Sequence, residues 1–182
     1  QLVENTLAEV LAANDARQLH VAETEKYAHV TYFFNGGEER EWEGETRILV
    51  PSPRDVPSYD LRPEMSAEEV ASRFCADIAD GYRFAVVNFA NPDMVGHTGA
   101  IPAVVEAVET VDECLDRVVE AVGAAGGVCL VTADHGAEVR ADDPPGRPLG
   151  RLLRTGRGGS AVGAHDVASS LPFSSELSCP SS

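Results

Sequence analysis

Two pairs of aspartate and histidine carry the residue types of a metal site. Asp93 and His97 lie four residues apart in "NFANPDMVGHTG", and Asp134 and His135 are neighbours in "VTADHG". Residues four apart face the same way on a helix, and neighbours on a tight turn can reach a common point. Carboxylate oxygen with imidazole nitrogen suits manganese or zinc better than calcium, which prefers oxygen alone. Each pair alone is better explained as a polar turn, but both pairs at adjacent strand ends make metal binding an equal alternative.

Two buried strands must bring these pairs together. Residues 83–93, "RFAVVNFANPD", and 126–136, "GGVCLVTADHG", are apolar runs without polar alternation, which predicts strands covered on both faces of a parallel sheet. Residues 104–122 between them place their valines on one helical stripe, so the whole predicts a parallel strand–helix–strand crossover. Such sheets bind ligands beyond the carboxyl ends of their strands, where Asp93 and Asp134 would both lie. Two metals there would clamp a phosphoryl group.

The N-terminal part adds further helices and strands. Apolar spacing and capping residues predict a helix over residues 2–13, a strand over 17–23, a helix from Thr24 as its cap to Phe34, a strand in 45–54 and a helix beginning at Ser66. A strand over "HVTYFF", residues 29–34, is the alternative to the second helix. The fold class is therefore α/β, with a mostly parallel sheet flanked by helices.

Composition limits the partners. The formal net charge of -16 argues against a nucleic-acid surface, which needs a clustered basic footprint, and against an anionic membrane. No apolar run reaches the roughly 18 to 20 residues of a transmembrane helix. The four cysteines, Cys75, Cys114, Cys129 and Cys179, are far apart, which favours buried free thiols over disulfides or zinc ligation. We expect a cytoplasmic protein with neither nucleic acid nor membrane as partner.

The sequence changes character after about Arg140. Residues 141–182 are rich in proline, glycine, serine and arginine and lack a sustained apolar period. We expect them to be a divergent, disordered tail that adds little to the core. Residues 1–140 then contain the folded part of the chain.

The strings around both aspartate–histidine pairs resemble a known family. "VAETEKYAHVTYFFNGG", "ILVPSPRDVPSYDLRPEMSA", "VVNFANPDMVGHTG", "AVETVDECLDRVV" and "VTADHG" follow, in order and spacing, the C-terminal portion of cofactor-independent phosphoglycerate mutase. The resemblance implies an incomplete fold of the alkaline phosphatase superfamily, with residues 1–140 as the C-terminal half of the metal-binding phosphatase domain. For the complete protein it implies a monomeric isomerase of glycolysis. That enzyme interconverts 3-phosphoglycerate and 2-phosphoglycerate through a phosphoserine, at a site with two Mn²⁺ ions.

The same resemblance implies roles for five residues. Asp93 and His97 match ligands of one metal, and Asp134 and His135 match ligands of the other. Lys26, in "ETEKYAH", matches the active-site lysine, which is both catalytic and substrate-binding. An ammonium group with three donors can neutralise a phosphate oxygen during transfer. Without the resemblance, Lys26 would be interpreted as a solvated surface lysine. The histidines His20 and His29 are expected to be packing or surface residues.

The chain also departs from the family. The family's nucleophilic serine, an aspartate ligand and the substrate-holding domain are expected before Gln1. Where the family has an "HTAHT"-like segment with the last histidine of the first metal, this chain has "GRPLGRLLRTGRGG", and His165 lies too far along to replace it. We therefore expect the chain alone to be inactive. The alternative function is a non-catalytic metal-binding or interaction fragment that lacks the serine nucleophile.

Overall fold

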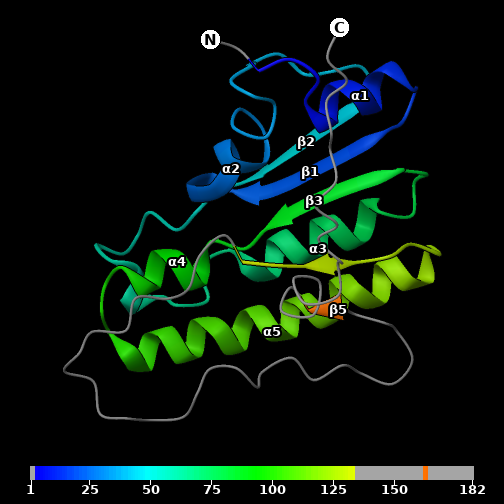
Figure 1. Cartoon of the computed structure of the whole chain (residues 1–182). Coiled ribbons are helices and arrows are strands. Elements are labelled where there is room, and N and C mark those ends of the chain that lie inside the picture. Colours follow the sequence, from blue (N-terminus) through cyan, green and yellow to red (C-terminus); the bar gives the residue numbers. More distant parts are fainter. Residues whose placement is uncertain (1–2, 134–161, 164–182) are drawn as a thin grey trace, which may run out of the picture.

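A parallel β-sheet with helices around it forms the centre of the protein (Figure 1). The computed structural model describes residues 3–133 and 162–163. The helices are α1 (Leu7–Ala13), α2 (Thr24–Val30), the short 3₁₀ helix η1 (Tyr59–Leu61), α3 (Ala67–Asp77), α4 (Asn91–Gly96) and α5 (Ile101–Ala124). The strands are β1 (Gln18–Glu23), β2 (Glu45–Val50), β3 (Phe84–Asn88), β4 (Leu130–Val131) and β5 (Val162–Gly163). The predicted α/β class, with a parallel sheet flanked by helices, is confirmed.

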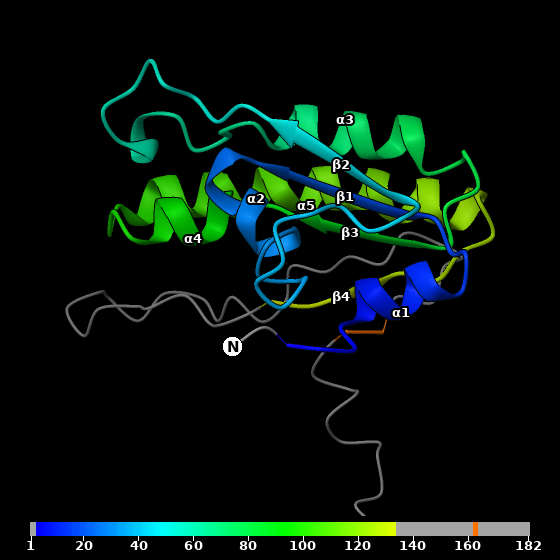
Figure 2. The same ribbon diagram turned by 90° about the horizontal axis from the view of Figure 1, so that it is seen from above.

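Strand β1 is the central strand of a three-stranded sheet with the order β2-β1-β3. Gln18 lies opposite Glu45 in β2 and opposite Phe84 in β3, and both pairings are parallel. All six residues of β1 are buried. Successive side chains of a strand point to opposite faces, so β1 must be covered on both. Figure 2 shows α3 on one side of the sheet and α1 on the other.

The main core lies between the sheet and helices α3 and α5. Its buried members are Leu19, Val21, Ile48, Val50, Ala67, Val70, Ala71, Phe74, Cys114 and Val118. A second cluster joins α4 to α5 and to the segment before α3, through Met65, Ala90, Val95, Ala103, Val104 and Ala107. Each fully buried aliphatic or aromatic side chain contributes about 1.5–3 kcal/mol to stability. Helix α4 is therefore fixed in place by α5.

Helices α2 and α4 lie at the same end of the sheet. Helix α2 begins at Thr24, directly after β1 ends at Glu23, and α4 begins at Asn91, soon after β3 ends at Asn88. In Figure 1 the arrowheads of β1 and β3 point toward both helices. This is the carboxyl end of the strands, where open α/β sheets bind their ligands.

Three predicted helix boundaries are wrong. Asn5 has a φ of 58°, outside the helical region, so α1 begins only at Leu7, after the Thr6 cap. Thr24 is the first residue of α2 and not its cap. Helix α2 ends at Val30, and residues 31–37 form turns, so neither the long helix nor the alternative strand over 29–34 exists. The turns let the Phe34 ring pack against the rings of His20 and Phe84, and these tertiary contacts override the helical spacing.

The predicted strand near residue 130 is wrong in its extent and its place. Strand β4 has two residues and pairs with β5, whereas β3 pairs with β1. Val128 and Leu130 are 85% and 77% exposed, and all five residues of β3 are only half-buried. A continuous apolar run predicts a strand that is buried on both faces of a sheet. It does not indicate which strands or helices will bury it. The expected crossover into one sheet is thus absent from residues 3–133.

The structure shows which of the described cysteines are free and whether any described helix could cross a membrane. Cys75, Cys114 and Cys129 are free thiols, and Cys179 lies outside the described residues. Burial is the main cause that raises the pKa of the Cys114 thiol to about 11, so this group is inert at neutral pH. Among the helices that the structure describes, none combines the length and the apolar character needed to cross a membrane.

Substitution of Gly36 by alanine is expected to destabilise the turn after α2. Gly36 has a φ of +67°, and a Cβ atom there would lie 2.8 Å from Thr6 Cγ2 and 2.9 Å from Val3 Cβ. Backbone strain and overpacking together lead us to expect a loss of about 2–3 kcal/mol in the free energy of unfolding, measured by urea denaturation.

Gly81→Ala is the matched control. Gly81 also has a positive φ, +83°, but the nearest atom to its added Cβ is Arg17 Nη1 at 3.9 Å. This variant tests backbone strain without a clash, and we expect it to lose about 1 kcal/mol. Equal losses in the two variants would contradict the close packing of Gly36 against Thr6.

Candidate functional site

Lys26 and Asp93 meet at the carboxyl end of the sheet. Lys26 lies in α2, which follows β1, and Asp93 lies in α4, which follows β3. The Lys26 Nζ atom donates a hydrogen bond to Asp93 Oδ2 at 2.5 Å. The two side chains are 7% and 17% exposed, so water screens this ion pair little. The fold thus brings together two residues that are 67 positions apart in the chain.

Helix α4 brings His97 to the same carboxylate. His97 follows the last residue of α4, and its Nε2 atom lies 3.0 Å from Asp93 Oδ1. The pair has the i, i+4 spacing of a helix, as the sequence predicts. The His97 side chain is 72% exposed, in contrast to Lys26. Asp93 therefore contacts a buried ammonium group through Oδ2 and an exposed imidazole through Oδ1.

The donor set of α4 fits part of a metal site. Asp93 and His97 offer carboxylate oxygen and imidazole nitrogen, which suit a divalent transition metal or zinc. In the described ranges 3–133 and 162–163, no three histidine, cysteine, aspartate or glutamate side chains gather closely enough to hold a metal ion. The second predicted pair, Asp134 and His135, lies outside the described residues, as does His165. The described part of the chain thus supplies two of the four predicted ligands.

Hydrogen bonds from the end of β2 fix the first turn of α2, and with it Lys26. The Ser52 N–H donates to Thr24 Oγ1 at 3.0 Å, and the Glu25 N–H donates to Ser52 Oγ at 3.4 Å. The Ser52 hydroxyl in turn donates to Glu23 Oε2 at 2.8 Å. Ser52 therefore ties the end of β1 and the beginning of α2 to one point.

The segment between β2 and α3 also bridges α2 and α4. The Tyr59 hydroxyl donates to Glu25 Oε1 at 2.7 Å, and the buried Asn91 side chain donates through Nδ2 to the Pro63 carbonyl at 2.8 Å. Burial and the neighbouring Glu25 carboxylate raise the pKa of Tyr59 to about 12, so its hydroxyl keeps its proton. Both helices of the Lys26–Asp93 pair are held by the same loop.

Sequence reasoning missed Glu23, Ser52 and Tyr59. All three support the site through hydrogen bonds. They lie in strings that resemble the family, but neither their residue type nor their spacing marks a role. One signal was available for Glu23, because this glutamate ends a strand that is buried along its whole length. Buried carboxylates need partners, so such a position indicates a local polar network. No comparable signal marks Ser52 or Tyr59 among the many polar residues of that loop.

The buried Glu23 carboxyl responds to pH in a defined direction. Burial raises the pKa of Glu23 above its ordinary 4.5, and hydrogen bonds from Ser52 and from the Ser66 backbone offset this in part. The folded state therefore holds this proton more tightly than the unfolded chain does. By linkage, the stability contributed by the protonated form is present below pH 4.5 and is lost as the pH rises through the folded pKa.

Glu23→Gln is expected to remove this loss. Glutamine keeps the shape and can still accept the Ser52 hydrogen bond, but it has no proton to lose. We expect the free energy of unfolding of the wild type to fall relative to that of E23Q as the pH rises above 4.5 through the folded pKa of Glu23, measured by urea denaturation at each pH. The control is Glu69→Gln, an exposed carboxyl in the first turn of α3. A difference between E23Q and wild type that stays constant with pH would refute the role of the buried proton.

His20 and His29 are placed as packing and surface residues, as the sequence predicts. His20 is fully buried, with Nδ1 2.5 Å from the Val30 carbonyl and Nε2 3.3 Å from Gln18 Oε1. Burial is the main cause that lowers the pKa of His20, so its ring is neutral at pH 7. His29 is exposed and lies edge-on to the Phe33 ring. These contacts account for both histidines without a ligand role.

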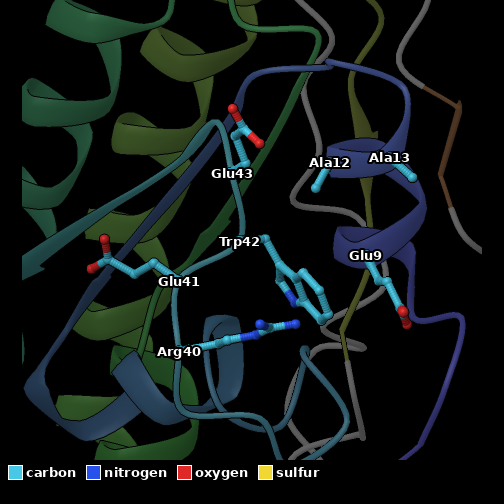
Figure 3. Close-up of a pocket in the computed structure, with 7 residues that line it drawn as sticks. All are labelled: Glu9, Ala12, Ala13, Arg40, Glu41, Trp42 and Glu43. Atoms are coloured by element: carbon cyan, nitrogen blue, oxygen red, sulfur yellow. The ribbon is translucent and has the colours of Figure 1, made fainter.

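A cavity of about 400 Å³ lies apart from these residues, between α1 and the segment before β2. Its walls are Glu9, Ala12 and Ala13 on one side and residues 40–43 on the other (Figure 3). The Arg40 guanidinium lies over the Trp42 ring, 4.4 Å from its centroid. None of the predicted site residues lines this cavity, so it is separate from the Lys26–Asp93 pair.

Comparisons with known proteins agree on one family. The family model described as the Metalloenzyme superfamily matches residues 1–156. The 2,3-bisphosphoglycerate-independent phosphoglycerate mutase of Desulforudis audaxviator is 58% identical over 149 residues, which are 82% of this chain and 29% of the relative. The enzyme of the same name from Laribacter hongkongensis is 57% identical over 79% of this chain and 28% of its own length. The chain thus spans less than a third of these curated relatives.

A solved structure is similar in fold. The crystal structure of Leishmania mexicana phosphoglycerate mutase at low cobalt concentration matches with a TM-score of 0.62 and 34% sequence identity. The match covers 66% of this chain and 22% of the Leishmania chain. The parallel sheet and its helices therefore have a counterpart in a larger protein.

Proposed function

We propose, since this chain belongs to the Metalloenzyme superfamily, that it is part of the phosphatase domain of a cofactor-independent phosphoglycerate mutase. The complete protein would interconvert 3-phosphoglycerate and 2-phosphoglycerate in glycolysis. The observation that carries the proposal is the meeting of Lys26, Asp93 and His97 at the carboxyl end of a parallel sheet. The names of the relatives support the choice of reaction. Because the chain spans about 29% of the first relative, the activity belongs to a longer protein.

Asp93 and His97 would hold one divalent ion, and Asp134 and His135 a second. We propose Mn²⁺, because oxygen and imidazole nitrogen together suit this ion. A bound divalent ion supplies a Lewis acid that polarises phosphoryl oxygens. The chain's own part is to orient the ligands: the backbone of α4 aligns Asp93 with His97, and the buried Asn91 holds α4 to the neighbouring loop.

Lys26 would bind and stabilise the phosphoryl group in transfer. Its ammonium group carries a full positive charge and three donors, and a transferring phosphoryl group spreads negative charge over its oxygens. Because the Lys26 side chain is only 7% exposed, water weakens this interaction little. The hydrogen bonds of Ser52 with Thr24 and Glu25 position the helix turn from which Lys26 extends.

We also propose the domain bounds of this chain, and the oligomeric state, cellular location and partners of the complete enzyme. Residues 1–140 would form the C-terminal half of the phosphatase domain, followed by residues 141–182 as a tail of divergent sequence. The complete enzyme would be a cytoplasmic monomer with phosphoglycerate as its substrate and without nucleic acid or membrane partners. The free thiols Cys75, Cys114 and Cys129 support a reducing compartment.

An enolase-coupled assay tests the function. We expect the longest protein encoded by the gene to convert 3-phosphoglycerate with added Mn²⁺, and its Asp93→Asn variant to lose this turnover. We expect the 182-residue chain alone to show none. Absence of turnover in the longer protein would sink the mutase proposal, and turnover by the short chain would refute its inactivity. The alternative of a non-catalytic fragment is not favoured, because the similarity to enzymes of this name covers 82% of the chain.

A further inference from the structure

The predicted metal ligand Asp93 is already paired with a cation of the chain itself. Lys26 is the only lysine in the sequence, and its Nζ atom lies 2.5 Å from Asp93 Oδ2. We propose that Lys26 and a divalent metal ion compete for Asp93, so that metal binding releases the Lys26 ammonium group to bind phosphate. This inference rests on the proposed function, because it assigns the metal to Asp93 and the phosphate to Lys26.

The competition follows from charge and burial. A bound dication beside Asp93 would repel the ammonium group, and the two partners of the ion pair are 7% and 17% exposed. In such a sheltered place the repulsion is screened far less than in water. A metal on Asp93 Oδ1 would also draw charge away from Oδ2, which accepts the Lys26 hydrogen bond, because both oxygens belong to one carboxylate. Metal binding therefore has to overcome the favourable interaction between Lys26 and Asp93, which lowers the affinity for the metal.

The geometry leaves the metal an approach that does not pass Lys26. His97, the second ligand, contacts the other oxygen of Asp93 and is 72% exposed. A metal ion would enter from this solvent side, between Asp93 and His97, while Lys26 lies on the buried side. The Lys26 backbone would stay in place, because Ser52 and Tyr59 anchor the first turn of α2. The Lys26 side chain can then turn away from Asp93 while its helix stays in place.

The competition couples metal and phosphate binding. With metal absent, the Lys26 ammonium group is held by Asp93 and is less available to phosphate. With metal bound, the group is released, so the metal raises the affinity for phosphate. By linkage, phosphate then raises the affinity for the metal by the same factor. Lys26 thus favours the state with metal and phosphate both bound over a state with only the metal or only the phosphate bound.

Titration of Mn²⁺ into the 182-residue chain tests the competition by isothermal calorimetry. We expect Lys26→Met to bind Mn²⁺ about five- to tenfold more tightly than the wild type, within the usual range of coupling between sites. Lys26→Arg keeps the positive charge and should remain close to the wild type. Asp93→Asn should bind Mn²⁺ at least tenfold more weakly, whatever stands at position 26.

Arg62→Met is the control for overall charge, because it removes one positive charge from a half-exposed residue that pairs with Asp55. It should change the affinity less than twofold. Three results would each overturn the proposal. Lys26→Met could bind Mn²⁺ no more tightly than the wild type, Arg62→Met could gain as much affinity as Lys26→Met, or neither the wild type nor Lys26→Met could bind Mn²⁺. Turnover by the longer protein together with equal affinities would overturn the competition and leave the proposed function intact.

The wild-type chain allows a second measurement that needs no folded variant. Since Lys26 is the only lysine, acetylation by an activated ester can be followed on the single peptide that contains it by mass spectrometry. We expect Mn²⁺ to speed the modification of Lys26 severalfold, because the ammonium group leaves the buried pair with Asp93. A rate that Mn²⁺ leaves unchanged or slows would contradict the release.

Discussion

Glu45→Ala is expected to lower the free energy of unfolding by about 3–5 kcal/mol, because it leaves buried polar groups without their acceptor. Glu45 is buried at the beginning of β2, and Arg47 Nε donates to its Oε1 atom at 2.6 Å. Asn35 Nδ2 lies within 3.2 Å of both carboxylate oxygens, and the backbone N–H of Trp42 donates to Oε2 at 2.8 Å. The total stability of a domain is about 5–15 kcal/mol, so this loss would remove much of the margin.

The Glu45 network explains how the long segment between α2 and β2 is held. Arg47 also donates to the carbonyls of Glu39 and Arg40, at 3.1 and 2.9 Å. Burial alone would raise the pKa of Glu45, but hydrogen bonds from Arg47 and from the Trp42 backbone outweigh it and lower the pKa. The stability contributed by the ionised form is therefore present above pH 4.5 and is lost as the pH falls through the folded pKa.

Urea denaturation of Glu45→Ala at pH 7 measures this effect. Glu43→Ala is the matched control, since Glu43 is exposed two positions earlier and should change stability by less than about 0.5 kcal/mol. Glu45→Gln keeps the shape and loses the charge, so we expect an intermediate value. A loss below about 1 kcal/mol in Glu45→Ala would contradict a buried network in which Arg47 depends on Glu45.

Local patterns predicted the strands β1 and β2 well and the end of α2 poorly. Residues 18–23 and 45–50 lie within the short strands that the sequence predicts, and the two strands pair with each other in one sheet. Phe34, by contrast, continues the helical spacing of α2, but its ring lies 5.3 Å from the His20 ring and 5.8 Å from the Phe84 ring. Contacts with rings so far away along the chain leave no trace in a local period. The helix therefore ends four residues before the spacing does.

The candidate site likewise combines a local contact that the sequence pattern predicts with a long-range contact that it does not predict. The contact between Asp93 and His97 is local to one helix, so their spacing predicts it. The contact between Lys26 and Asp93 depends on two helices at neighbouring strand ends, and only the family resemblance pointed to Lys26. The pairing of β4 could not be predicted. The apolar run at 128–131 predicts a buried strand, but it does not indicate which segment that strand pairs with.

Lys26→Met in the longer protein is the second large effect. On the proposal that Lys26 stabilises the transferring phosphoryl group, we expect kcat to fall about 10²–10³-fold, the usual loss when one donor to a transition-state oxygen is removed. The KM for 3-phosphoglycerate should change much less, because the charge on the phosphoryl oxygens matters most during transfer. The enolase-coupled assay with saturating Mn²⁺ gives both constants.

Two comparisons separate this role from a structural one. Lys26→Arg keeps the charge but replaces a compact ammonium group by a larger planar one, so we expect it to recover only part of kcat. Because the ion pair with Asp93 competes with the metal, Lys26→Met should not lose Mn²⁺ affinity, and its low kcat cannot then be assigned to an empty metal site. A loss of kcat below tenfold with full Mn²⁺ binding would show that the phosphoryl group is stabilised elsewhere.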